Sequence, residues 1–129
     1  MTPRAKRTVT CSPVERAGRQ ARAEEFWQSA EDLRELDDGS NAVLSLYVLA
    51  GIAASDVVCC ARLGEYSKSE NHADAIGLLR RADPSLVPPL QRLLSRKSES
   101  AYGVAPMSAT RVTEARSAAD KLVRAARRL

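Results

Sequence analysis

The stretch NAVLSLYVLAGIAASDVVCCARL, residues 41–63, decides the fold. Apolar residues occupy every face of a helix written from this stretch, which predicts a helix surrounded by others. The small residues from Ala50 to Ser55 allow neighbouring backbones to approach closely. Asp56 is the one carboxylate in this segment, and a charge near the middle of a membrane-spanning helix is costly. We therefore expect a buried core helix and no contact with a membrane.

Signals at helix ends place four further helices around it. Ser12-Pro13, with a glutamate at capping-box spacing, begins a helix that runs to about Leu36. Ser40 or Asn41 caps the central helix, and Gly64 ends it. The remaining helices are expected at about 71–82, from 86–89 to about 102, and from a cap at Ser108 onward. With no strand signal and no repeat, this predicts an all-α, up-and-down bundle of about five helices.

The length and the charge distribution divide the chain into two parts. Residues 1–12 are basic and lack periodicity, so we expect a disordered basic tail, and residues 13–129 form a single helical-bundle domain. Residues 1–22 contain six basic residues and one acidic residue, Glu15, and the last nineteen residues contain six more basic residues. Such basic ends suit a nucleic-acid backbone or an acidic partner, or are simply a solvated surface.

The three cysteines, Cys11, Cys59 and Cys60, do not predict a secretory disulfide framework, because their number is odd. Neighbours on a helix point in different directions, so we interpret Cys59 and Cys60 as small core residues and Cys11 as a tail thiol in a reducing cytoplasm. The basic N-terminus has no apolar run behind it and is not a signal peptide, which also favours a cytoplasmic protein. No metal-ligand spacing is present, and no cofactor is expected.

The end of the fourth predicted helix carries the first candidate site. Arg96, Lys97 and Tyr102 lie within two turns of one another. One interpretation is structural, since cations are favoured near a helix C-terminus. The other is functional, with Arg96 or Lys97 and the phenol of Tyr102 binding a phosphate or a stacked base.

Asp56 and His72 are the other candidates. A carboxylate inside an apolar helix must find a partner or shift its pKa, and Lys97, Arg96 and Tyr102 are the partners we expect. This would be a buried pair that fixes helix register, or a binding pocket made of Asp56, Lys97 and Tyr102. His72 lies near the start of the third helix, where it bonds free amides or a neighbour; a catalytic role requires the loop to fold it against Arg96.

A family resemblance adds to these interpretations. It is carried by Ala50–Asp56, by Ala61–Gly64, by Asn71–Leu79, and by Leu93-Leu94 with Lys97 and Ala101–Gly103. Over about residues 18–127 this pattern resembles the HEPN superfamily. The resemblance implies a helical bundle, usually a homodimer, in RNA-targeting toxins, defence systems or toxin–antitoxin pairs with a nucleotidyltransferase-like partner. Catalytic HEPN members are metal-independent ribonucleases with an Arg followed, four to six residues later, by His.

This sequence departs from that motif, because Ser100 to Gly103 stand where the histidine is expected. Histidine is the side chain best suited to proton transfer near neutral pH. We therefore expect an RNA- or nucleotide-binding protein without ribonuclease activity. The alternatives are a non-catalytic protein that dimerises or docks a partner, and a ribonuclease that uses Arg96 and Tyr102, with or without His72.

Overall fold

Helix α2 (Asn41–Leu63) lies at the centre of the bundle, as its composition predicts. The computed structural model describes residues 8–69, 71–104 and 106–129. Over this part of the chain the elements are β1 (Thr8–Thr10), α1 (Pro13–Leu36), α2, β2 (Glu65–Ser67), α3 (His72–Ala82), the 3₁₀ helix η1 (Pro84–Leu86), α4 (Val87–Tyr102) and α5 (Ala109–Arg127). The predicted all-α bundle of about five helices is confirmed, with one small two-stranded sheet added to it.

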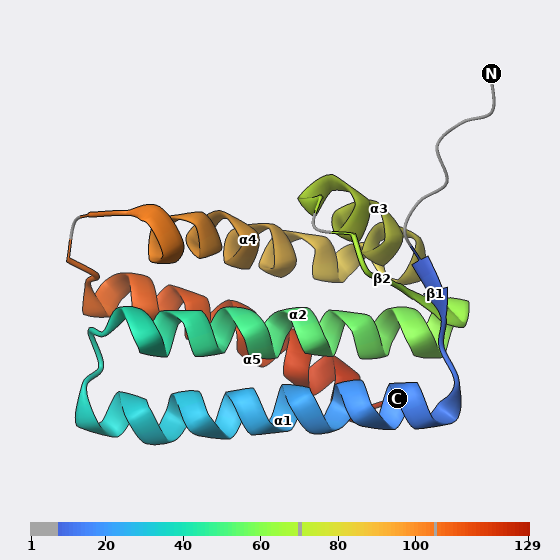
Figure 1. Cartoon of the computed structure of the whole chain (residues 1–129), viewed down its shortest axis with the longest axis horizontal. Helices are drawn as coiled ribbons and strands as arrows, with labels where there is room; N and C mark the ends of the chain where they lie inside the picture. Colours follow the sequence, from blue (N-terminus) through green and yellow to red (C-terminus); the bar gives the residue numbers. More distant parts are fainter. Residues whose placement is uncertain (1–7, 70, 105) are drawn as a thin grey trace.

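The four long helices alternate in direction along the chain (Figure 1). In that view α1 lies below α2, α4 lies above it, and α5 lies behind. The short helix α3 sits at the end of the bundle that also carries β1 and β2. Helix α2 contacts α1, α3, α4 and α5. This central position explains why its sequence is apolar on every side.

Side-chain caps set the helix ends where the sequence predicts them. The Ser12 hydroxyl accepts a hydrogen bond from the Glu15 amide at 3.1 Å and so caps α1. The Ser40 hydroxyl accepts from the Val43 amide at 3.0 Å, which identifies Ser40 rather than its neighbour as the cap of α2. Gly64 ends α2 with φ of 72°, in the left-handed region that side chains disfavour.

Small residues of α2 bring the other helices close, and Gly51 marks the tightest approach. A Cβ atom at Gly51 would lie 2.2 Å from Cδ1 of Leu93 and 3.2 Å from Cδ1 of Leu122. Both leucines are fully buried, so neither side chain has free space to move into. The absence of a side chain at Gly51 therefore lets α4 and α5 pack directly on α2.

Gly51→Ala is expected to lower the free energy of unfolding by about 1 kcal/mol, because the cost of overpacking exceeds the gain in helix propensity. Gly18→Ala on α1 is the matched control, since a Cβ placed there would meet no atom within 4 Å beyond the adjacent backbone of its own helix. That control is expected to raise stability by about 0.5–1 kcal/mol. Urea unfolding of both variants measures the two signs, and stabilisation of similar size at both positions would contradict the packing described for Gly51.

Helix α2 is also the one helix of the described residues that is long and apolar enough to cross a membrane. Of its most apolar window, 72% is buried inside the protein. Leu49 is 39% exposed, on a side of the helix that the bundle leaves partly uncovered. Burial of this extent is typical of the core helix of a bundle.

The N-terminal region differs from the predicted tail of residues 1–12. Thr8–Thr10 form β1, which pairs antiparallel with β2 so that Val9 lies opposite Tyr66. The Cys11 amide then donates to the carbonyl of Gly64 at 2.8 Å. Residues 1–7 lie outside the described residues. The prediction failed over 8–12 because strands of three residues are too short to show periodicity in the sequence.

The prediction of unpaired cysteines was wrong for two of the three. Cys11 and Cys60 form a disulfide, with their Cα atoms 5.4 Å apart and a separation of 49 positions in the sequence. Cys59 is buried and free. The two neighbours do point in different directions, as expected, because Cys60 faces Cys11 while Cys59 faces a cavity on another side of α2.

Candidate functional site

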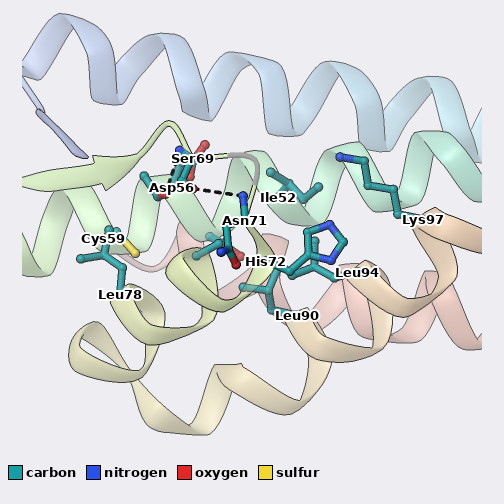
Figure 2. A pocket seen from close by; sticks show the side chains of 13 residues that line it. Ile52, Asp56, Cys59, Ser69, Asn71, His72, Leu78, Leu90, Leu94 and Lys97 are labelled. Carbon is teal, nitrogen blue, oxygen red and sulfur yellow. Dashed lines mark hydrogen bonds between the residues drawn. The ribbon is translucent and has the colours of Figure 1, made fainter. Parts of the chain in front are cut away.

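A cavity of about 90 Å³ opens between α2, α3 and α4 (Figure 2). Ile52, Leu90 and Leu94 supply apolar surface. The polar lining comes from α2, from β2 and the loop after it, from the start of α3 and from the C-terminal half of α4: Ser55, Asp56, Ser67, Ser69, Asn71, His72 and Lys97. We call this cavity the α2–α4 pocket. Its lining combines an apolar wall with acidic, basic and neutral hydrogen-bonding groups, as ligand sites commonly do.

Asp56 lies in the wall of the pocket and forms an ion pair with Arg19 of α1. Its side chain is 15% exposed, and its Oδ2 accepts from Arg19 Nε at 3.0 Å and lies 2.8 Å from Arg19 Nη2. Burial raises the pKa of Asp56 to about 6, and the charge and hydrogen bond of Arg19 offset part of that rise. The carboxylate is therefore ionised at neutral pH and held toward α1.

The expected partners of Asp56 were wrong. Arg96, Lys97 and Tyr102 all lie on α4, whereas Arg19 reaches Asp56 from α1. A buried carboxylate such as Asp56 needs a cation wherever it lies, so the sequence predicts that a cation is present. Which residue supplies the cation depends on which helix covers that side of α2. Lys97 does line the same pocket, without an ion pair to Asp56 among the bonds of the described residues.

A hydrogen-bonded turn before α3 forms one wall of the pocket. The Ser69 hydroxyl donates to the Asp74 carboxylate at 2.8 Å and accepts from the Asn71 amide at 3.0 Å. Asn71 caps α3 by accepting from the Ala73 amide at 2.8 Å. These bonds fix the position of His72, the first residue of α3, at the edge of the cavity.

Lys97 stands at the other end of the pocket from Asp56 and Cys59 in Figure 2. Its side chain is exposed, and it also lines a second hollow of about 190 Å³ with Ser45, Val48, Leu49 and Ser100. The two hollows follow each other along the seam between α2 and α4. Lys97 is thus a cation between two recesses that are mostly apolar.

The structure places the other two predicted residues elsewhere. Arg96 turns to α5, where its Nη2 donates to Glu114 Oε2 at 2.9 Å. Tyr102 is 87% exposed at the end of α4 and does not line the pocket. The five candidates therefore separate: Asp56, His72 and Lys97 share one cavity, and Arg96 and Tyr102 lie outside it.

Three arginines of the basic C-terminal helix form ion pairs within the chain. Arg116 donates to Glu31 at 2.7 Å, and Arg127 donates to Glu24 with two bonds of 2.7 Å. Arg124 pairs with Asp120 one turn away. The pairs with Glu31 and Glu24 tie α5 to α1. All three pairs reduce the free positive charge of this face, so the charge count of the sequence overstates its attraction for a nucleic acid.

Two kinds of chemistry find little support at the pocket. Burial, with the nearby carboxylates of Asp56 and Glu65, raises the pKa of the Cys59 thiol to about 12, so that it stays protonated and a poor nucleophile. Among the described residues no three His, Cys, Asp or Glu side chains gather into a group able to hold a metal ion. The charged and titratable groups that line the pocket, apart from that thiol, are one cation, one imidazole and one carboxylate.

Sequence reasoning missed three contributors to the site: Arg19, Ser69 and Asn71. Arg19 is one of many basic residues near the N-terminus and carries no mark of its own. Ser69 precedes the predicted helix 71–82 and Asn71 begins it, and serine and asparagine are common at helix starts whatever the site nearby.

Comparisons with family models, with curated proteins and with solved structures find no match to this chain. The resemblance to the HEPN superfamily accordingly stays a prediction. The pocket's own residues carry the inference of function.

Proposed function

We propose that the α2–α4 pocket binds one nucleotide unit, as part of RNA or as a free nucleotide, without cleaving RNA. The observation that carries this proposal is the convergence of Lys97, His72 and Asp56, from three helices, on one partly apolar cavity. Drug-sized ligands fill about 300–1,000 Å³, so a cavity of about 90 Å³ accepts only part of a ligand, such as a single base or a sugar.

Each group has a role that suits this ligand. Lys97, exposed at the rim, supplies a charge for a phosphate outside the cavity. Ile52 and Leu94 offer apolar surface to the face of a base or ribose. Asp56 is an acceptor for an amino or hydroxyl group of the ligand, since Arg19 holds Oδ2 and ionised carboxylates have further lone pairs.

The position of Arg96 supports binding rather than cleavage. Catalytic HEPN proteins place an arginine and a histidine together, and here the Arg96 guanidinium is bonded to Glu114 on α5. His72 lies in the pocket with Lys97 instead. A protein of this kind would serve a toxin–antitoxin or defence module as its non-cleaving RNA-binding member, which is the context that the resemblance implies.

Lys97→Ala is expected to weaken binding of a short, fluorescein-labelled single-stranded RNA about tenfold at low salt, because one charge-assisted phosphate contact is lost. The slope of log affinity against log salt should become shallower by about 0.7, the value for one phosphate on a single strand. Fluorescence anisotropy measures both quantities. Adenosine monophosphate as competitor distinguishes a free nucleotide from a longer RNA as the preferred ligand.

Lys121→Ala is the matched control, since Lys121 is an exposed lysine of α5 that lines neither hollow of the α2–α4 seam. It should bind RNA as the unaltered protein does, and the RNA should be recovered intact from every sample. Equal affinity of Lys97→Ala and the unaltered protein would contradict the proposal and favour the alternative, in which exposed Leu49 on α2 belongs to a surface that docks a partner protein. Cleavage that His72→Ala abolishes would favour a ribonuclease.

A further inference from the structure

We propose that the Cys11–Cys60 disulfide is a redox latch that holds one wall of the α2–α4 pocket in place, so that its reduction weakens ligand binding there. The effect on binding rests on the proposed function. The release of the pocket wall upon reduction does not rest on the proposed function, because it concerns only the contacts of β1, β2 and the turn that follows β2.

The latch acts on β1, the outer strand of the sheet, because β2 packs against α2 and α3 while β1 is otherwise held by its pairing with β2, by half-buried Val9 and by the Cys11–Gly64 hydrogen bond. Strands β1 and β2 are three residues long and pair only with each other. An isolated two-stranded sheet is marginally stable in water. Tyr66 is buried, while Val9 opposite it is only half-buried. The disulfide at Cys11, one residue beyond β1, anchors the end of β1 to α2 and so raises the effective concentration of β1 at β2.

A short path of direct contacts leads from the latch to the pocket. Thr8 lies opposite Ser67, the last residue of β2, and Ser67 lines the pocket. The Ser67 hydroxyl accepts from the Ser69 amide at 3.2 Å, and the Ser69 hydroxyl in turn accepts from the Asn71 amide. Loss of β1 from β2 therefore removes the outer support of the wall that carries Ser67, Ser69 and His72. Figure 2 shows Ser69 and His72 in this wall.

The chemistry of closing is a balanced thiol–disulfide exchange with a low-molecular-weight disulfide as the oxidant. The thiolate of Cys11, which is half-buried, attacks one sulfur of the small disulfide and releases one small thiol. The thiolate of Cys60 then attacks the mixed disulfide at Cys11 and releases the second small thiol. The two protons of the protein thiols end on the two released thiols. Small dithiols reverse the reaction.

The location of Cys59 keeps this exchange specific. Cys59 is buried and faces the α2–α4 pocket, on another side of α2 from Cys11. A resting state with both thiols reduced suits a reducing cytoplasm, where structural disulfides are rare and those that form are commonly transient sensors. The latch would then close under oxidising conditions and favour ligand binding.

Hydrogen exchange followed by mass spectrometry tests the release directly, on the full chain before and after treatment with a small dithiol. Segments 8–11 and 65–69 are expected to exchange about tenfold faster after reduction, while the α2 and α5 amides stay protected. Anisotropy with the same labelled RNA should show about fivefold weaker binding to the reduced form. Cys11→Ser should behave as the reduced protein does and should not respond to the dithiol.

The outcomes separate the two proposals. Unchanged exchange of 8–11 and 65–69 upon reduction would overturn the latch, whatever the binding result. Faster exchange with equal RNA affinity in both forms would overturn the link to the pocket. Faster exchange with no RNA binding in either form would overturn the proposed function and leave the release of the wall established. Loss of the far-ultraviolet helical signal in Cys11→Ser would also overturn the latch, because a switch requires an intact bundle.

Discussion

Replacing Arg19 with alanine is expected to lower the free energy of unfolding by about 3 kcal/mol at pH 8. Arg19 is the partner of Asp56, whose side chain is 15% exposed and which accepts two contacts of 3.0 and 2.8 Å from the guanidinium. Removal of the guanidinium leaves an ionised carboxylate in the wall of an apolar helix without compensation. Urea unfolding at pH 8 measures the loss.

Two further variants make this result specific to the Arg19–Asp56 pair. Arg22→Ala removes the neighbouring guanidinium of α1, which pairs with Glu25 on the exposed surface at 3.2 Å, and should cost less than about 1 kcal/mol. Adding Asp56→Asn to Arg19→Ala should recover most of the loss, because a neutral amide needs no counter-charge. Equal losses for Arg19→Ala and Arg22→Ala would show that the Asp56 pair is not buried in the way described.

Asp56 should also make the protein less stable as the pH rises from about 4 to 7. Burial raises its pKa in the folded state to about 6, above the ordinary value of 3.8. The unfolded chain therefore releases this proton at lower pH than the folded chain does. The stabilising contribution is complete below pH 3.8 and is lost as the pH passes through 6. The size of the change from this group is about 3 kcal/mol.

Comparison with Asp56→Asn isolates this contribution from those of the other carboxylates. The difference in free energy of unfolding between the unaltered protein and the variant, measured by urea unfolding at steps between pH 4 and 8, should shift steadily in favour of the variant across the middle of that range. A difference that stays constant with pH would mean that burial does not raise the pKa of Asp56.

Much of the fold can be predicted from the sequence because the residues that set the helix ends act locally. Ser12, Ser40 and Gly64 mark helix ends through bonds to residues within one turn, so their spacing alone places the boundaries. The small sheet and the disulfide have no such local mark. Cys11 and Cys60 are far apart in sequence, and whether they meet depends on how α1 and α2 pack.

For the candidate site, the sequence predicts individual residues but not that they lie together. Asp56 and His72 stand out because each is chemically unusual in its surroundings, and Lys97 stands out as a cation near the end of a helix. Their meeting in one cavity depends on the turn before α3, whose bonds through Ser69 and Asn71 are set by tertiary structure. Arg96 and Lys97 are neighbours in sequence, yet α4 directs one to Glu114 and the other to the pocket.

The proposal that the α2–α4 pocket binds a nucleotide is tested most directly by mapping where the ligand binds. Adenosine monophosphate or a short RNA is titrated into ¹⁵N-labelled protein while the amide chemical shifts are followed. We predict saturable shifts concentrated at Ile52–Cys59, Ser67–Ala75 without residue 70, and Leu90–Lys97, the segments that line the pocket. Shifts confined to the arginines of α5, or no saturable shift at low salt, would contradict the proposal that this pocket binds a nucleotide.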